Sequence, residues 1–513
     1  MQLSKRYDYV VVGAGTAGSA LASRLSEDPG VRVLLLEAGA EEPLDLMAIP
    51  RAWPALAGSS ADWGDSSTEQ RFAGRAMPLP RGRGMGGSSS INGLAFVRGH
   101  RSSYDSWPDQ GAVGWAYDDL LPFFKRSENA PGRDDSVRGT GGPLTVTPPA
   151  EPNPVITACV QAAVEVGHRR VEDYSSGLEI GFGWPDNNIV DGVRQSAADA
   201  YLRPILDRPN LDVFCEVMVR RLQIVDGRCI GVEYAAGDQL VSVGCTREVV
   251  LCAGAIGSPQ LLMVSGVGPQ RHLREVGVAP VLDLPGVGAN LQDHPASTLT
   301  YALKQPMPVI PANPLGEALG LVRTDAALDA PDLQILFGGF APLTPLLKGP
   351  DEGYTMLFSV MNPRSRGTVR LASPDAEAAP LIDPNYLSDD RDVATIMAGL
   401  RMAREIGQAC ALTDWRGEEI LPGPMARDND AVRDYLRQSL TCYYHYCGTC
   451  RIGDDDMAVV DTELRVRGLT GLRVADASVM PSIVSGNTNA TVCAIAERAA
   501  HLINPPQQSS LER

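Results

Sequence analysis

Long apolar runs are missing from this sequence. No stretch of about 18 consecutive apolar residues occurs, so we expect no membrane-spanning helix. The first residues, MQLSKRYDYVVVGAG, also lack an apolar leader segment and a small-residue cleavage site. These absences predict a protein that is not secreted, does not cross a membrane and works in the cytoplasm.

Positive charge is scarce as well. The 513 residues include 45 Lys and Arg against 62 Asp and Glu, which gives a net charge of -17 at pH 7. Nucleic acids bind basic surfaces, so we expect no nucleic-acid partner. An acidic surface can steer a cationic substrate, but it also simply keeps a protein in solution. The composition, 44% hydrophobic and 21% charged, is typical of a globular protein, and the length allows two or three domains.

The ten cysteines are scattered along the chain, and we expect most of them to be buried thiols rather than a disulfide framework. One cluster, Cys442, His445, Cys447 and Cys450, superficially resembles a zinc site. Structural zinc sites usually bring two ligand pairs separated by a longer loop, and here no second pair exists. We therefore expect no metal.

A strand, a glycine-rich turn, a helix and a second strand open the chain. The β-branched run Tyr7–Val12 predicts a strand buried in a parallel sheet, and the Ala- and Leu-rich segment Ser19–Leu25 predicts a helix. Between them lies GAGTAG, residues 13–18, and a second apolar run, Val31–Leu36, ends at Glu37. This is a complete βαβ unit with the glycine pattern of dinucleotide-binding folds.

Each glycine of this pattern has a physical task. Gly13 permits the tight turn, Gly15 lets the backbone approach a pyrophosphate at the helix N-terminus, and Gly18 lets helix and strand pack closely. Glu37 is expected to accept hydrogen bonds from the adenosine ribose hydroxyls, and its charge disfavours the 2′-phosphate of NADP. The motif alone leaves FAD and NAD open.

Further elements are expected downstream. Strand-like runs are Leu211–Val219, Glu248–Cys252, Leu333–Phe337, Tyr354–Val360 and Thr368–Leu371. The turn Pro363–Gly367, between the last two runs, predicts a hairpin. Ala394–Ile406 and Ala490–Ile503 are expected to be helices, and Pro505–Arg513 a frayed tail.

Three segments resemble the glucose–methanol–choline (GMC) oxidoreductases. They are GRGMGGSSSING at residues 82–93, GAIGSPQLLMVSGVG at 254–268, and HYCGTCRIG at 445–453 followed by LRVADASVMPSIVSGNTNATVCAIAERAAHLI at 472–503. Their order and spacing extend the resemblance over essentially the whole chain. It implies an FAD-dependent enzyme that oxidises an alcohol.

The resemblance also implies the architecture. We expect an α/β fold in which a Rossmann-like FAD-binding domain (residues 1–150, 205–295 and 441–513) is interleaved with a substrate-binding domain. The second domain (residues 151–204 and 296–440) is expected to be α+β and built on an antiparallel sheet. The oligomeric state stays open.

The family's cofactor contacts are carried over to the matching positions. The glycine loop would hold the pyrophosphate, Val219 would contact adenine through its backbone, and Asn489 would lie near the pyrimidine end of the flavin. The implied cofactor-binding residues are Gly13, Gly15, Thr16, Ala17, Gly18, Glu37, Ala38, Gly86, Gly87, Ser88, Asn92, Gly93, Leu94, Val219, Ala253, Gly254, Asp476, Ala477, Asn489 and Ala490.

Three positions depart from the family pattern. Met85 conservatively replaces an aliphatic residue, and Tyr446 replaces a proline that often follows the active-site histidine, which changes the pocket wall. Ile91 stands where some relatives carry a histidine that bears the flavin covalently. The resemblance therefore implies non-covalent FAD.

The chemistry requires a base for the alcohol proton, and a neutral imidazole suits this task. His445 occupies the family's base position, and Asn487 the second position, where its amide would hydrogen-bond the developing alkoxide. The other histidines are expected to be structural: His100, His168, His272, His294 and His501. Tyr443 and Tyr444 either line the substrate pocket or pack in the core.

The expected function is oxidation of a primary alcohol to an aldehyde, with an aromatic or heteroaromatic alcohol as the first guess. Dioxygen or another acceptor would reoxidise the flavin. Choline-like cations and amino sugars stay open as substrates, as does a natural-product tailoring role. A flavin-containing lyase of the same fold is a second class, and a flavoprotein that only binds is a third.

Overall fold

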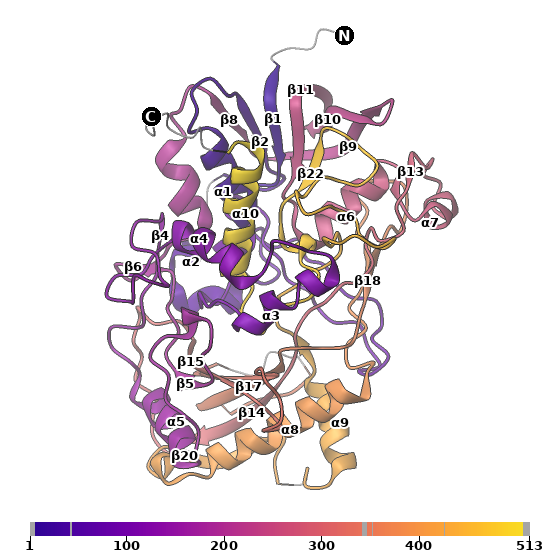
Figure 1. Ribbon diagram of the computed structural model, residues 1–513. Helices are drawn as coiled ribbons and strands as arrows, with labels where there is room; N and C mark the ends of the chain where they lie inside the picture. The colour runs from indigo at the N-terminus through magenta and orange to yellow at the C-terminus, as the bar shows by residue number, and fades with distance from the viewer. Residues whose placement is uncertain (1–5, 42–43, 341–345, 351, 425, 506–513) are drawn as a thin grey trace.

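Two seven-stranded sheets, one at each end of the molecule, organise the fold (Figure 1). The computed structural model describes residues 6–41, 44–340, 346–350, 352–424 and 426–505. The expected α/β architecture is confirmed, because one sheet is mixed and mainly parallel and the other is antiparallel. Apart from Pro505, the expected frayed tail lies outside the described residues.

The mixed sheet has the order β8–β2–β1–β11–β10–β9, with β22 beside β11. Its strands are β1 (Tyr7–Val12), β2 (Val33–Leu36), β8 (Leu211–Phe214), β9 (Val217–Val225), β10 (Arg228–Ala236), β11 (Gln239–Leu251) and β22 (Leu472–Val474). β1 runs parallel to β2 and β11, and α1 (Thr16–Leu25) packs against β1, β2 and α10 (Asn489–Ile503). This burial accounts for the unbroken apolar sequence of β1.

The expectation of one strand over Leu211–Val219 is wrong. The run divides into β8, which lies parallel to β2, and β9, which lies antiparallel to β10. Glu216 separates them with a left-handed φ of 56°. Such a conformation ends an extended strand and redirects the chain. As a result Val219 lies on β9, on the far side of this turn from β8.

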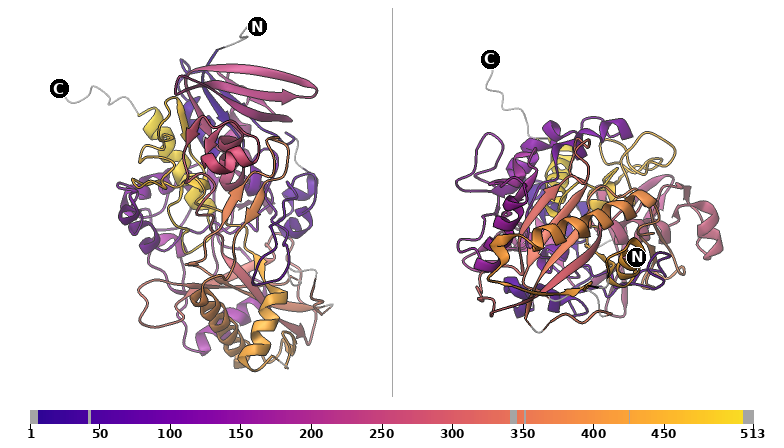
Figure 2. Two further views of the ribbon diagram at one scale, coloured as in Figure 1. Left: turned by 90° about the vertical axis from the view of Figure 1, so that its right-hand side faces the viewer. Right: turned by 90° about the horizontal axis from the view of Figure 1, so that it is seen from below.

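The antiparallel sheet has the order β20–β14–β17–β16–β15–β5, with β21 beside β14. Its strands are β5 (Gly181–Gly183), β14 (Pro295–Leu303), β15 (Gly316–Val322), β16 (Leu333–Gly338), β17 (Gly353–Val360), β20 (Arg416–Leu421) and β21 (Thr441–Cys442). α8 (Asp390–Gly407) and α5 (Pro154–Glu165) cover one face, and Figure 2 shows α8 in orange across the sheet. The opposite face is turned towards the mixed sheet.

The hairpin expected around Pro363–Gly367 is also wrong. β18 (Thr368–Arg370) follows that turn but pairs with β19 (Leu381–Asp383). β17 cannot accept it, because β14 and β16 already occupy both of its edges.

The remaining elements are short. The helices are α2 (Asp45–Ala48), α3 (Arg101–Asp105), α4 (Tyr117–Ser127), α6 (Gly254–Val264), α7 (Gln270–Glu275) and α9 (Asn429–Ser439). The strand pairs are β3 (Glu128–Asn129) with β4 (Leu144–Thr145), β6 (Ile189–Val190) with β7 (Val193–Arg194), and β12 (Val267–Gly268) with β13 (Leu282–Asp283). Within the described ranges, no helix combines the length and apolar character that a bilayer crossing requires.

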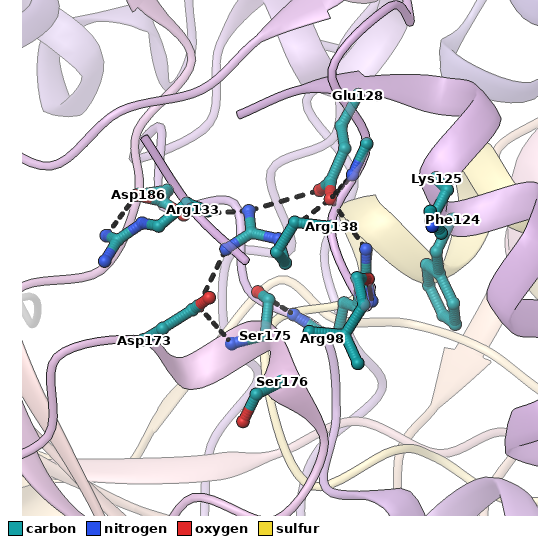
Figure 3. Close-up of polar contacts among 12 residues, drawn as sticks. Arg98, Phe124, Lys125, Glu128, Arg133, Arg138, Asp173, Ser175, Ser176 and Asp186 are labelled. Carbon is teal, nitrogen blue, oxygen red and sulfur yellow. Dashed lines mark hydrogen bonds and ion pairs between the residues drawn. The ribbon is translucent and has the colours of Figure 1, made fainter. Parts of the chain in front are cut away.

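Figure 3 shows a buried ionic network around Glu128 that holds Arg98. The backbone at Arg98 packs against the loop at residues 484–486. The carboxylate of Glu128 accepts hydrogen bonds from Arg98 Nη2 at 2.6 Å and Arg138 Nε at 2.8 Å, and all three side chains are fully buried. A Cβ on Gly486 would lie 3.2 Å from the carbonyl oxygen of Arg98. The network therefore fixes a backbone that packs directly against this loop.

Glu497 joins the first and last helices of the chain. Its fully buried carboxylate, on α10, accepts hydrogen bonds at 2.8 Å from Nε and Nη2 of Arg24 on α1, and one at 2.9 Å from Tyr201 Oη. Arg24 also pairs with Glu27, which is 44% exposed.

We predict that Glu497→Ala lowers the free energy of unfolding by about 3 kcal/mol, because it leaves the largely buried Arg24 with the exposed Glu27 in place of its buried partner. Glu27→Ala, which removes the exposed partner of the same arginine, is the control and should cost less than about 1 kcal/mol. Urea unfolding of both variants measures the difference. Equal losses would contradict the assignment of Glu497 as the link between the two helices.

Candidate active site

A cavity of about 600 Å³ lies between the two sheets. On one side it is lined by residues at the carboxyl ends of β1 and β2, by β9, and by the first residues of α6 and α10. On the other side Gly316, Leu336 and Leu357 contribute from β15, β16 and β17. Ligands of open α/β sheets bind at the carboxyl ends of the strands, so this position suits a dinucleotide.

Most of the residues expected to bind the cofactor line this cavity. They are Gly13, Gly15, Thr16, Ala17, Glu37, Ala38, Gly87, Ser88, Asn92, Gly93, Leu94, Val219, Ala253, Gly254, Asp476, Ala477 and Asn489. Three expected residues do not line it. Gly18 packs against the carbonyl of Gly13, the amide of Gly86 donates to Ala14 O at 2.8 Å, and Ala490 is fully buried. Their expected part in cofactor binding remains a prediction.

The glycine loop has the geometry that its sequence predicts. Gly13 has a φ of 99°, a conformation that favours glycine. A Cβ on Gly18 would lie 1.8 Å from Gly13 O, so helix and strand meet there at a distance only glycine allows. At Gly15 the nearest atom to an added Cβ is Gly87 Cα at 3.9 Å. Gly15 therefore borders open space within the cavity rather than packed protein.

Two helix N-termini reach the cavity without a side-chain cap. α1 begins after Gly15 and α10 after Thr488, neither has a side-chain capping bond, and neither first turn contains an acidic residue. The first amides of a helix lack partners within it and carry partial positive charge. The donor set at α1 therefore fits an anion such as the pyrophosphate of FAD.

Glu37 has a second role that the sequence did not reveal. Its carboxylate accepts hydrogen bonds from the backbone amides of Ala14 at 2.7 Å, Gly39 at 2.8 Å and Gly84 at 3.0 Å. Burial raises the pKa of Glu37, and these three amides oppose that shift by favouring the carboxylate. Glu37 thus ties the glycine loop to residues 82–84. Its expected contact with ribose remains a prediction.

His445 and Asn487 meet at the other end of the cavity. Both line it, and Nδ2 of Asn487 lies 3.4 Å from Nε2 of His445. Burial lowers the pKa of His445 from 6.5 to about 3, because the charged ring would lose its hydration. The imidazole is therefore neutral near pH 7, as a proton acceptor must be.

The sequence did not reveal two residues that contact His445: His294 and Asp293. Nδ1 of His294 lies 2.9 Å from Nδ1 of His445, and Oδ1 of Asp293 accepts the backbone amide of His445 at 2.7 Å. Burial raises the pKa of Asp293 to about 6, against the effect of four hydrogen-bond donors. Both residues come from GANLQDHP, where His294 was expected to be only structural; nothing local in that segment indicates the pairing.

Aromatic side chains form much of the wall near His445. Tyr443 and Tyr444, for which pocket lining and core packing were both open, line the cavity, and so do Tyr446 and Phe340. Tyr444 has a left-handed φ of 65°, a strained conformation of the kind that clusters at functional sites. Trp53 was missed, because no motif surrounds it; its ring meets that of Tyr444 edge-on at 6.4 Å.

The cysteines near the histidine are inert groups in the core. Cys442, Cys447 and Cys450 are buried and free. Burial raises the pKa of each thiol, which opposes formation of a reactive thiolate.

Comparison with known proteins points the same way as the geometry. The model of the family described as GMC oxidoreductase matches residues 7–296 with its N-terminal part and 363–496 with its C-terminal part. An oxygen-dependent choline dehydrogenase of Brucella anthropi is 38% identical over 524 residues, which cover 96% of this chain and 94% of that protein.

Solved structures are similar over the same length. Pyridoxine 4-oxidase from Mesorbium loti superposes with a TM-score of 0.93 at 39% identity, over 97% of this chain and 99% of that one. A fungal aryl-alcohol oxidase superposes with a TM-score of 0.86 at 25% identity, over 98% and 99% of the two chains.

The two glycines provide a matched test of the cofactor site. We predict that Gly15→Ala leaves the fold intact but weakens FAD binding by about 10- to 100-fold, because its Cβ intrudes on the cavity. Gly18→Ala should instead lower the melting temperature of the cofactor-free protein, because its Cβ collides with Gly13 O. Flavin titration and thermal melts separate the two effects. Unchanged FAD affinity in Gly15→Ala would contradict the placement of the pyrophosphate.

Proposed function

The chain belongs to the GMC oxidoreductase family of FAD-dependent enzymes that act on CH–OH donors, and on that basis we propose that it oxidises a primary alcohol to an aldehyde. The observation that carries this proposal is the neutral His445 beside Asn487 in the wall of the cavity. Dioxygen is the proposed final acceptor, in keeping with the names of the oxygen-dependent and oxidase relatives.

Each residue of the pair has a separate task in this proposal. Nε2 of His445 accepts the hydroxyl proton of the alcohol. Nδ2 of Asn487 donates a hydrogen bond to the oxygen as negative charge develops on it. Bound FAD supplies the hydride acceptor. The surrounding aromatic wall excludes water, which strengthens both interactions.

The proposed substrate is a neutral alcohol on an aromatic or heteroaromatic ring. Tyr443, Tyr444 and Trp53 offer faces and edges on which such a ring can pack. Among the described residues the carboxylates that line the cavity are Glu37 and Asp476, and backbone amides already hydrogen-bond both of them. No uncommitted carboxylate of the described lining is therefore available to a substrate ammonium group.

The cofactor is proposed to be held without a covalent bond. Ile91 lines the cavity at the position where some relatives carry a histidine, and an aliphatic side chain cannot form such a link. Release of free FAD on acid precipitation of the protein is the expected result.

We predict that a benzylic or heteroaromatic primary alcohol bleaches the flavin when added without oxygen, and that readmitted air restores the spectrum. His445→Ala should keep bound FAD but slow bleaching by at least about 10²-fold, because the base is lost. Asn487→Asp should also be slow, because a carboxylate repels the alkoxide. Exposed His501 provides the control, and His501→Ala should behave as the unaltered protein.

Other outcomes would change the proposal. Bleaching by choline but not by ring alcohols would replace the neutral substrate with a cation held by aromatic faces. Bound flavin that no alcohol bleaches, in a protein that turns a cyanohydrin over, would favour the lyase. Normal bleaching in His445→Ala would remove His445 as the base.

A further inference from the structure

Gln334 is a polar residue in an otherwise apolar strand. β16 reads LQILFG, and every residue of it is buried. The Gln334 side chain is fully buried, and a buried amide is costly unless its hydrogen bonds are made. Because strand residues alternate, Gln334 lies on the same face as Leu336, the face that lines the cavity.

Two hydrogen bonds connect this amide to the active site. Tyr443 Oη donates to Gln334 Oε1 at 2.6 Å, and Gln334 Nε2 donates to Asn487 Oδ1 at 3.4 Å. Burial raises the pKa of Tyr443, so its hydroxyl keeps the proton that it donates. With its oxygen engaged, Asn487 turns Nδ2 towards Nε2 of His445.

The other ring nitrogen of His445 faces a second histidine. Its Nδ1 faces Nδ1 of His294 at 2.9 Å, so exactly one proton lies between the two rings. Burial and the adjacent His445 ring lower the pKa of His294, whereas the backbone of Met361 and Val484 raises it. Nε2 of His294 has no hydrogen-bond partner among the described residues, so the direction of the contact between the two rings is set from the Asn487 side.

These contacts determine which nitrogen of His445 carries the proton. Asn487 Nδ2 donates towards Nε2 of His445, so that nitrogen carries a lone pair rather than a proton. The proton of His445 then lies on Nδ1, which donates it to Nδ1 of His294. The bonds thus run in one direction, from Tyr443 through Gln334, Asn487 and His445 to His294. The reverse direction would place a proton on Nε2 of His445 and would block the base.

We propose that Gln334 and Tyr443 are positioning residues that orient the Asn487 amide and thereby keep Nε2 of His445 unprotonated towards the alcohol. This inference rests on the proposed function, since it assigns Nε2 as the proton acceptor. Neither residue needs to touch the reacting carbon. Their part is to choose one of two otherwise equivalent orientations of an amide and one of two tautomers of a ring.

The decisive variant is Gln334→Glu, which keeps the shape of the side chain and reverses the direction of its hydrogen bond with Asn487. An ionised carboxylate only accepts, so Asn487 should turn Nδ2 towards it and present Oδ1 to His445, which stabilises a proton on Nε2. A protonated carboxyl can donate to Asn487 and restore the original orientation. The titratable group in contact with this position is Tyr443. His445 and His294 follow beyond Asn487. Asp293 accepts the backbone amides of Tyr443 and His445.

The measurement is the anaerobic rate of flavin reduction between pH 5 and 8. In the unaltered protein, protonation of His445 should not lower the reduction rate over this range, because the pKa of His445 is about 3. Gln334→Glu should be slower by about 10²-fold at pH 8 and recover as the pH falls, because burial raises the pKa of the new carboxyl. Gln334→Leu should be slower at every pH, without recovery.

Tyr443→Phe removes the hydroxyl that donates to Gln334 and keeps the aromatic ring. It should slow reduction by about fivefold, since the hydrogen bond that orients the amide is worth roughly 1 kcal/mol and a tenfold change needs about 1.4 kcal/mol. Tyr435→Phe is its matched control: Tyr435 is also buried against the antiparallel sheet, and its hydroxyl donates to Thr298 O at 2.5 Å. That variant should reduce at the rate of the unaltered protein.

A readout other than turnover is the ¹⁵N spectrum of histidine-labelled protein. It should show Nε2 of His445 unprotonated in the unaltered protein and protonated in Gln334→Glu at pH 8. Equal, pH-independent losses in Gln334→Glu and Gln334→Leu would overturn the inference, because they indicate packing alone. An unaltered protein that no alcohol reduces would instead overturn the proposed function.

Discussion

Burial of a neutral imidazole is the constraint on which this active site depends. His445 cannot carry charge in the free protein without a large desolvation cost, which lowers its pKa to about 3. A neutral ring has one protonated and one unprotonated nitrogen, and only the latter can accept a proton. The site therefore needs neighbours that fix the tautomer, and Asn487 and His294 contact the two nitrogens. Asp293 fixes the backbone of the same residue.

The fold meets this need by bringing distant segments to one cavity. The mixed sheet supplies the glycine loop and two uncapped helix N-termini, where an anion fits. The antiparallel sheet supplies Gln334 and the apolar wall. The loop that carries Asn487 packs on the backbone of Arg98, whose side chain is held in the buried ionic network. The polar groups far from the reaction thus support the position of a single amide.

Local patterns predicted much of this arrangement. The glycines, the strand β1 and the helix α10 follow from short-range sequence, whereas the pairing of His445 with Asn487 followed from the family resemblance. The break between β8 and β9 was missed because the sequence is strand-like on both sides of Glu216, and the left-handed conformation of that residue divides the run. Gln334 was missed because its partners are 109 and 153 residues away. No periodicity or motif encodes contacts of that separation, and the same holds for His294.

The location of one proton is the central claim of this account, and neutron diffraction from perdeuterated crystals tests it most directly. The account predicts nuclear density for a deuteron on Nδ1 of His445, directed at His294, and none on Nε2. It also predicts that the ND₂ group of Asn487 faces Nε2. A deuteron on Nε2 of His445, or an Asn487 amide turned the other way, would contradict it.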